Sequence, residues 1–147
     1  TRNQMDLLVR ALVSFPIDIK IIVKPHPACM IVPEDYPEID IKVTTHPLKD
    51  LLGRCDLAYS SPVTSAAVDA YCFGISVITA LDSDALNLSP LRNCGDVCFV
   101  STPEELSDSL TSITSRDVGS NDKKVFFTLD SELPRWKELL LESNTYV

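Results

Sequence analysis

The sequence lacks the short motifs that identify several large enzyme classes. It contains no GxGxxG, no P-loop lysine motif, no GxSxG and no HExxH. These absences argue against a dinucleotide oxidoreductase, a P-loop NTPase, a serine hydrolase and a zinc protease. Any site in this chain is therefore expected to be assembled from scattered loops.

Long apolar runs and positive charge are also scarce. No run approaches the roughly 20 apolar residues of a membrane helix, and no basic segment with a cleavage site opens the chain, so we expect a soluble, cytoplasmic protein. Thirteen Lys and Arg against 21 Asp and Glu give a net charge of -8. This field repels polyanions and argues against nucleic acid as a partner, although backbone N–H groups and one or two cations can still hold a phosphate.

The five cysteines include no CxxC pair, and three of them lie among apolar neighbours. This usage is typical of reduced thiols in a cytosolic chain. Cys94 and Cys98 have a spacing that a metal site can use, but no histidine or second pair lies near them. We therefore expect no metal ion.

The length of 147 residues and the 45% hydrophobic content suit one core, so residues 1–147 are expected to form a single domain. Because the chain opens on Thr1 and runs straight into a helical pattern, we interpret it as a fragment of a longer protein. β-Branched and apolar runs predict strands at residues 18–24, 39–45, 56–61, 75–81 and 96–100. Helical spacing and capping residues predict helices at residues 3–15, 47–52, 62–74, 101–114 and 133–143.

Strands that alternate with helices indicate βαβ units with right-handed crossovers. The expected fold is a Rossmann-like, three-layer α/β/α domain with a mostly parallel sheet of about five to six strands. Residues 115–124 are expected to form a mobile loop, and residues 125–147 an extended segment followed by the last helix.

Ligands of such sheets bind beyond the carboxyl ends of the strands, which directs attention to the loops there. The stretch SSPVTS follows the third expected strand and brings Ser60, Ser61, Thr64 and Ser65 to the start of a helix. Hydroxyls and free N–H groups at one helix start can bind a phosphate. Simple capping of the helix by one hydroxyl is the alternative, and most such clusters do only that.

Lys24 and His26 follow the first expected strand, and Pro25 and Pro27 restrict the backbone that carries them. A neutral histidine there can donate a hydrogen bond, and a cationic one can stand beside a phosphate. A structural histidine in a proline turn is the alternative, and His46 before Pro47 illustrates it.

Three carboxylates lie near the same loops. Asp69 comes four residues after Ser65 on one helix, so it can face the crevice and accept ribose hydroxyls, or it can be a solvated helix residue. Asp82 and Asp84 follow the fourth expected strand and can touch a sugar or start a turn.

The KPHP motif at residues 24–27 and the long stretch LKDLLGRCDLAYSSPVTSAAVDAYCFGISVITA resemble the carboxyl-terminal, donor-binding half of GT-B-fold glycosyltransferases. The resemblance covers roughly residues 18–142. It is nearest to bacterial surface and capsular polysaccharide enzymes, including sialyl- and Kdo-transferase relatives with His-Pro and serine-rich motifs. The closing FFTLDSELPRWKELL resembles the tail of a surface carbohydrate biosynthesis group.

The resemblance implies that the domain binds a nucleotide sugar, such as a CMP-sugar, with no metal or other cofactor. It implies that His26 stabilises the departing phosphate, that His26 holds this phosphate together with Ser60, Ser61, Thr64 and Ser65, and that Asp69 stands where many relatives have a ribose-binding glutamate. Lys24 joins this candidate nucleotide site through its position at the end of the first expected strand. The resemblance also implies a missing amino-terminal acceptor domain, transferase activity only in the whole protein, and association of that protein with the inner face of the membrane.

Other functions remain open for the same fold. They are a nucleotide-sugar epimerase, a glycerophosphotransferase, and a non-catalytic, flavodoxin-like interaction module. A receiver-like version of that module needs a phosphoacceptor aspartate at a strand end, and the strand that ends at Tyr59 and Ser60 offers none.

Overall fold

The computed structural model describes residues 2–13, 15–82, 84, 86–115, 126 and 130–142. Strands and helices alternate along these residues, which confirms an α/β chain. The elements are α1 (Arg2–Leu12), β1 (Ile21–Val23), the 3-10 helix η1 (Pro33–Asp35), β2 (Ile41–Val43), α2 (Leu48–Leu52), β3 (Leu57–Ser60), α3 (Ser65–Phe73), β4 (Ser76–Ala80), β5 (Cys98–Val100), α4 (Pro103–Thr114) and α5 (Pro134–Glu142).

The strands pair in parallel, as expected, and the arrangement is consistent with a Rossmann-like fold. They form two small sheets: β1 pairs with β2, and β4 lies between β3 and β5. The expectation of one sheet of about five to six strands is therefore wrong. Strands β1 and β2 are only three residues long, and Pro25, two residues after the end of β1, lacks the N–H that a longer β1 would use.

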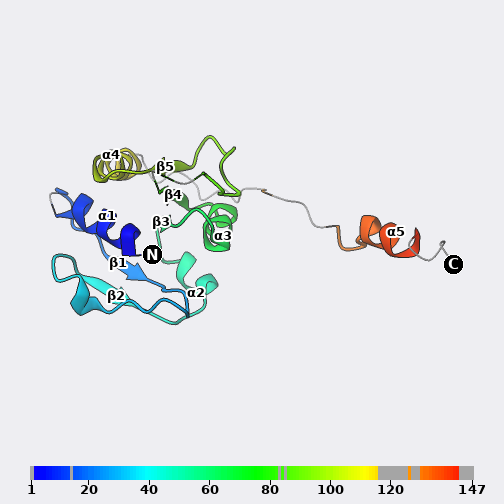
Figure 1. Cartoon of the computed structure of the whole chain (residues 1–147), viewed down its shortest axis with the longest axis horizontal. Helices are drawn as coiled ribbons and strands as arrows, with labels where there is room; N and C mark the ends of the chain where they lie inside the picture. The colour runs from blue at the N-terminus through cyan, green and yellow to red at the C-terminus, as the bar shows by residue number, and fades with distance from the viewer. Residues whose placement is uncertain are drawn as a thin grey trace.

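One apolar cluster joins the two sheets by packing. Met5 and Leu8 of α1 and Leu106 and Leu110 of α4 lie in it with Ile78 of β4. Partly buried side chains from β1, β2 and β3 border the same cluster. Helices α1 and α4 therefore cover one face of the strands, and Figure 1 shows them together on one side.

A second cluster covers the opposite face. It contains Leu52 of α2, Ala67 and Ala70 of α3, and Val77 of β4. Val77 and its neighbour Ile78 are 1% and 0% exposed and belong to different clusters, so β4 is buried on both faces. The three-layer arrangement expected from the sequence is present around this strand.

The ends of α3 and α4 follow the capping residues of the sequence. Gly74 ends α3 with a φ of 90°, a left-handed conformation that glycine adopts without steric cost. Thr102 begins α4 in a capping box: its side chain accepts from the N–H of Glu105, and the Glu105 carboxylate accepts from the N–H of Thr102. These caps fix where the adjoining loops start and end.

Helix α5 confirms the expected last helix, and Figure 1 shows it apart from the sheets and their helices. Its described side chains are exposed, including Trp136 and Leu141. Of the loop expected at residues 115–124, residues 116–124 lie outside the described residues, as do residues 125 and 127–129 of the extended segment that follows it. No helix in the described part of the chain is long and apolar enough to cross a membrane.

Replacing Leu106 by alanine tests the first cluster. Leu106 is 0% exposed, so Leu106→Ala is expected to lower the free energy of unfolding by about 2–5 kcal/mol, because it leaves a cavity. Leu141→Ala is the control: this side chain is 71% exposed, so the change should stay within roughly 0.5 kcal/mol. Urea denaturation measures the free energy of unfolding of both variants. Equal losses of stability in the two would contradict the assignment of Leu106 to the core.

Candidate functional site

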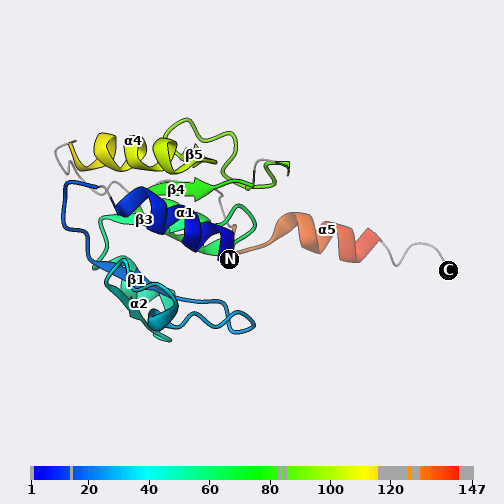
Figure 2. The same cartoon turned by 60° about the vertical axis from the view of Figure 1, so that its left-hand side comes forward.

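The carboxyl ends of β1, β3 and β4 lead into the segments that carry most of the predicted site residues. Figure 2 shows the segment after β1 and the loop after β4 leaving the strands on the same side of the molecule. We call the segments at residues 24–29, 60–65 and 81–82 the carboxyl edge. Edges of this kind hold the ligands of open α/β sheets.

Ser60, the last residue of β3, has a buried hydroxyl oxygen with no hydrogen-bond partner among the described residues. Thr79 of β4 lies opposite Ser60 in the register, and its buried hydroxyl also has none. Side chains at paired positions share one face of a sheet, so both hydroxyls lie on the face that α3 covers. A buried polar group without a partner costs free energy, which ligands or water can recover.

Thr64 caps α3, since its Oγ1 accepts a hydrogen bond from the N–H of Ala66 at 3.2 Å. The capping alternative is therefore correct for Thr64, while Ser61 and Ser65 have no such role. Ser65 is the first residue of α3, and Asp69 lies one turn later; both are exposed on the helix. The first turn of α3 retains N–H groups that the helix itself cannot satisfy.

His26 closes a tight turn after β1. Its carbonyl accepts from the N–H of Cys29 at 2.8 Å, and its Nδ1 accepts from the N–H of Ala28 at 3.1 Å. Because Nδ1 is engaged within this turn, Nε2 is the nitrogen of the exposed ring that is left to face a ligand.

The predicted site residues are only partly brought together. Lys24 is exposed directly after β1, while Ser60 and Thr64 lie at the junction of β3 and α3. No hydrogen bond between described residues joins the His26 turn to residues 60–65. Their joint use in one phosphate site therefore stays a prediction. His46 follows β2, and its N–H is held by Thr44 Oγ1 at 3.2 Å.

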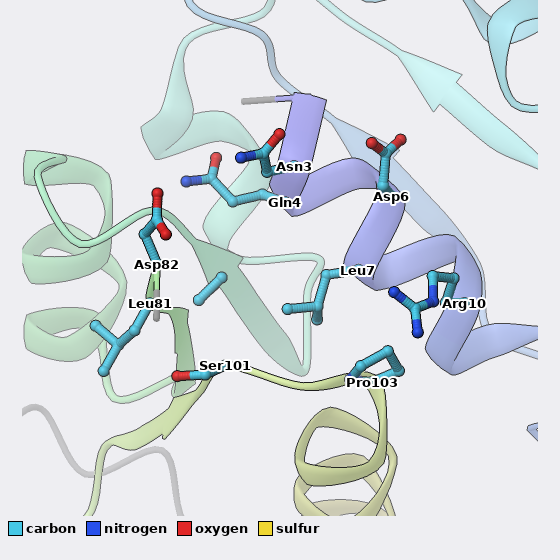
Figure 3. A pocket seen from close by; sticks show the side chains of 10 residues that line it. Asn3, Gln4, Asp6, Leu7, Arg10, Leu81, Asp82, Ser101 and Pro103 are labelled. Atoms are coloured by element: carbon cyan, nitrogen blue, oxygen red, sulfur yellow. The ribbon is translucent and has the colours of Figure 1, made fainter. Parts of the chain in front are cut away.

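A pocket of about 400 Å³ opens between one side of α1 and the ends of β4 and β5. We call it the α1–β4 pocket (Figure 3). None of the residues predicted to bind the nucleotide lines this pocket. Asp82, which the sequence suggested as a possible sugar contact, lies on its rim. Its lining residues are Asn3, Gln4, Asp6, Leu7, Arg10, Ala80, Leu81, Asp82, Ser101 and Pro103.

Part of this pocket can be predicted from the sequence, because Asp82 and Ser101 follow two expected strands. The part that α1 contributes cannot be predicted in this way. Helix α1 precedes every strand, and its polar residues resemble the solvated face of an ordinary surface helix. One long-range hydrogen bond helps to place α1: the Tyr59 hydroxyl donates to the carbonyl of Gln4 at 3.0 Å.

Within the described residues, no three His, Cys, Asp or Glu side chains lie close enough together to hold a metal ion. The five cysteines are free and half-buried. The chain matches no family model, no curated protein and no solved structure.

Tyr59→Phe tests the link between α1 and β3. Losing the bond to Gln4 is expected to destabilise the fold by roughly 1 kcal/mol at neutral pH. Burial also raises the pKa of Tyr59 above its usual value, so the fold favours the neutral hydroxyl. That stabilisation is complete below pH about 10 and is lost as the pH rises further.

Urea denaturation at increasing pH measures both effects. The unsubstituted protein should lose stability more steeply above pH about 10 than Tyr59→Phe does. Tyr71 serves as the internal reference, because burial, with smaller effects of Cys94 and Asp96, raises its pKa to about 12 in either protein. Identical slopes for the two proteins would show that Tyr59 does not couple to folding.

Proposed function

We propose that this chain is the donor-binding half of a GT-B-fold glycosyltransferase of surface polysaccharide synthesis. Its ligand is a nucleotide-activated sugar, such as a CMP-sugar, at the carboxyl edge. An amino-terminal domain supplies the acceptor site and the general base, so the chain by itself has no transferase activity. The resemblance of residues 18–142 to that family and the parallel α/β fold support this assignment.

The observation that carries the proposal is the buried, unpartnered hydroxyl of Ser60 at the carboxyl end of β3. Five residues later α3 begins, with Thr64 satisfying one of its free N–H groups. A phosphate at this junction accepts hydrogen bonds from the Ser60 hydroxyl and from the remaining N–H groups of the first turn of α3. Ser61 and Ser65 add two further hydroxyl donors.

His26 acts in this proposal as a hydrogen-bond donor. With Nδ1 held by the N–H of Ala28, its Nε2–H can donate to an oxygen of the departing phosphate. Negative charge increases on the phosphate as its bond to the sugar breaks. The hydrogen bond from His26 and the dipole of α3 therefore stabilise the transition state. Lys24 adds positive charge, and Asp69 accepts from the ribose hydroxyls.

A nucleotide panel tests the function. At 100 times the dissociation constant, binding to the folded state alone adds about 2.7 kcal/mol of stability. For a chain of this size, that is a rise in melting temperature of roughly 5–10 °C. Differential scanning fluorimetry with CMP, CDP, UDP and GDP measures it. No rise with any of the four nucleotides would reject the proposal.

Two variants show whether the nucleotide uses the carboxyl edge. Ser60→Ala removes a hydroxyl that has no hydrogen-bond partner in the part of the chain that the structure describes, so the ligand-free protein should keep its stability while the nucleotide-dependent rise falls or disappears. His26→Ala should reduce the rise as well. His46→Ala is the matched control, because His46 is also exposed and precedes a proline after a strand. Equal responses of the two histidine variants would exclude His26 from the site.

A further inference from the structure

We propose that the α1–β4 pocket binds the ring of a neutral monosaccharide. The pocket has Leu81 and Asp82 in common with the carboxyl edge but none of the residues proposed to hold the nucleotide, so this inference holds whether or not a nucleotide binds at Ser60. Its volume of about 400 Å³ lies near the lower end of the roughly 300–1,000 Å³ of small-molecule sites. That volume suits a single ring better than a whole nucleotide sugar.

Part of the inner surface of the pocket is apolar. Ala80 is buried at the end of β4, and half-buried Leu7 and Pro103 lie on either side of it from α1 and α4. Figure 3 shows the Leu7 side chain pointing into the space between α1 and the strands. A pyranose ring has C–H groups that gain free energy when such a surface removes them from water.

The rim is rich in groups that both donate and accept hydrogen bonds. Asn3 and Gln4 contribute side-chain amides, and Ser101 contributes a hydroxyl. None of these three side chains has a hydrogen-bond partner in the described part of the chain, and Figure 3 shows the Gln4 amide directed toward the Asp82 carboxylate. Sugar hydroxyls also donate and accept, so each can pair with such a rim.

The charged residues favour a neutral ligand. Asp82 and Arg10 lie toward opposite ends of the pocket in Figure 3, and both are exposed, so ion pairing with a ligand contributes little. Their hydrogen-bonding capacity remains: the carboxylate accepts from hydroxyls and the guanidinium donates to them. Because Asp6 also lines the pocket and the chain carries a net charge of -8, an anionic ligand is disfavoured.

Hydrogen bonds hold the rim in place before any ligand arrives. The Tyr59 hydroxyl fixes the Gln4 backbone, and the Glu105 carboxylate accepts from the N–H of Ser101 at 2.6 Å. Asp82 Oδ1 accepts from the N–H of Asp84 at 3.3 Å, which leaves the second carboxylate oxygen for a ligand. A rim that is already ordered loses less conformational entropy when it binds.

NMR titration of the 147-residue chain tests the proposal. The side-chain NH2 signals of Asn3 and Gln4 are followed with D-glucose, D-galactose and N-acetyl-D-glucosamine, and separately with L-serine, inorganic phosphate and CMP. At least one sugar should shift these signals saturably, with a dissociation constant on the order of millimolar. The backbone signals of Ser60 and Ala66 report nucleotide binding independently, so either site can fail without the other.

A matched pair of variants locates the sugar. Asp82→Asn keeps the oxygen that holds the Asp84 N–H but removes the charged acceptor, so sugar binding should weaken about tenfold or more. Asp84→Asn makes the same change of charge outside the pocket lining and should leave binding unchanged. Absence of saturable shifts with every sugar, equal effects of the two variants, or saturation by L-serine or phosphate alone would overturn the proposal.

Discussion

The burial of β4 on both faces is the constraint on which the rest of this structure depends. Val77 and Ile78 are adjacent, point to opposite faces, and are both excluded from water. A strand of this kind is stable only if helices cover it from both sides, which α1 with α4 and α2 with α3 achieve. The parallel pairing with β3 and β5 then brings the carboxyl ends of three strands to one edge.

Both proposed sites follow from that edge, but they use opposite faces of it. The Ser60 and Thr79 hydroxyls lie on the face of α3, where a helix start supplies unsatisfied N–H groups. The α1–β4 pocket lies where α1 passes the ends of β4 and β5. At the first site the start of a helix lies against strand ends, and at the second the side of a helix does. At both sites, polar groups without hydrogen-bond partners in the sheet remain available to a ligand.

Local signals in the sequence predicted most elements and several of their ends. The apolar run at residues 75–81 contains β4, Gly74 ends α3, and the Thr102–Glu105 pair begins α4. Each of these depends on neighbours within a few residues, so a single sequence is sufficient. The prediction of a single large sheet was wrong. Whether β1 pairs with β3 depends on how segments far apart in the sequence pack together, and in the structure these two strands do not pair. The stretches before Pro25 and before His46 and Pro47 look like ordinary strands in the sequence, yet the hydrogen-bonded strands cover three residues each.

The sequence by itself determined the periodicity, the caps, the acidic charge and the residue types at the strand ends, because these are properties of short segments. Only the tertiary structure decided that the Ser60 hydroxyl is buried with no hydrogen-bond partner among the described residues. It also decided that Asn3 and Gln4 stand beside Asp82. The physical reason is that burial and long-range hydrogen bonds, such as the one from Tyr59 to Gln4 across 55 positions of the chain, arise only when distant segments pack together.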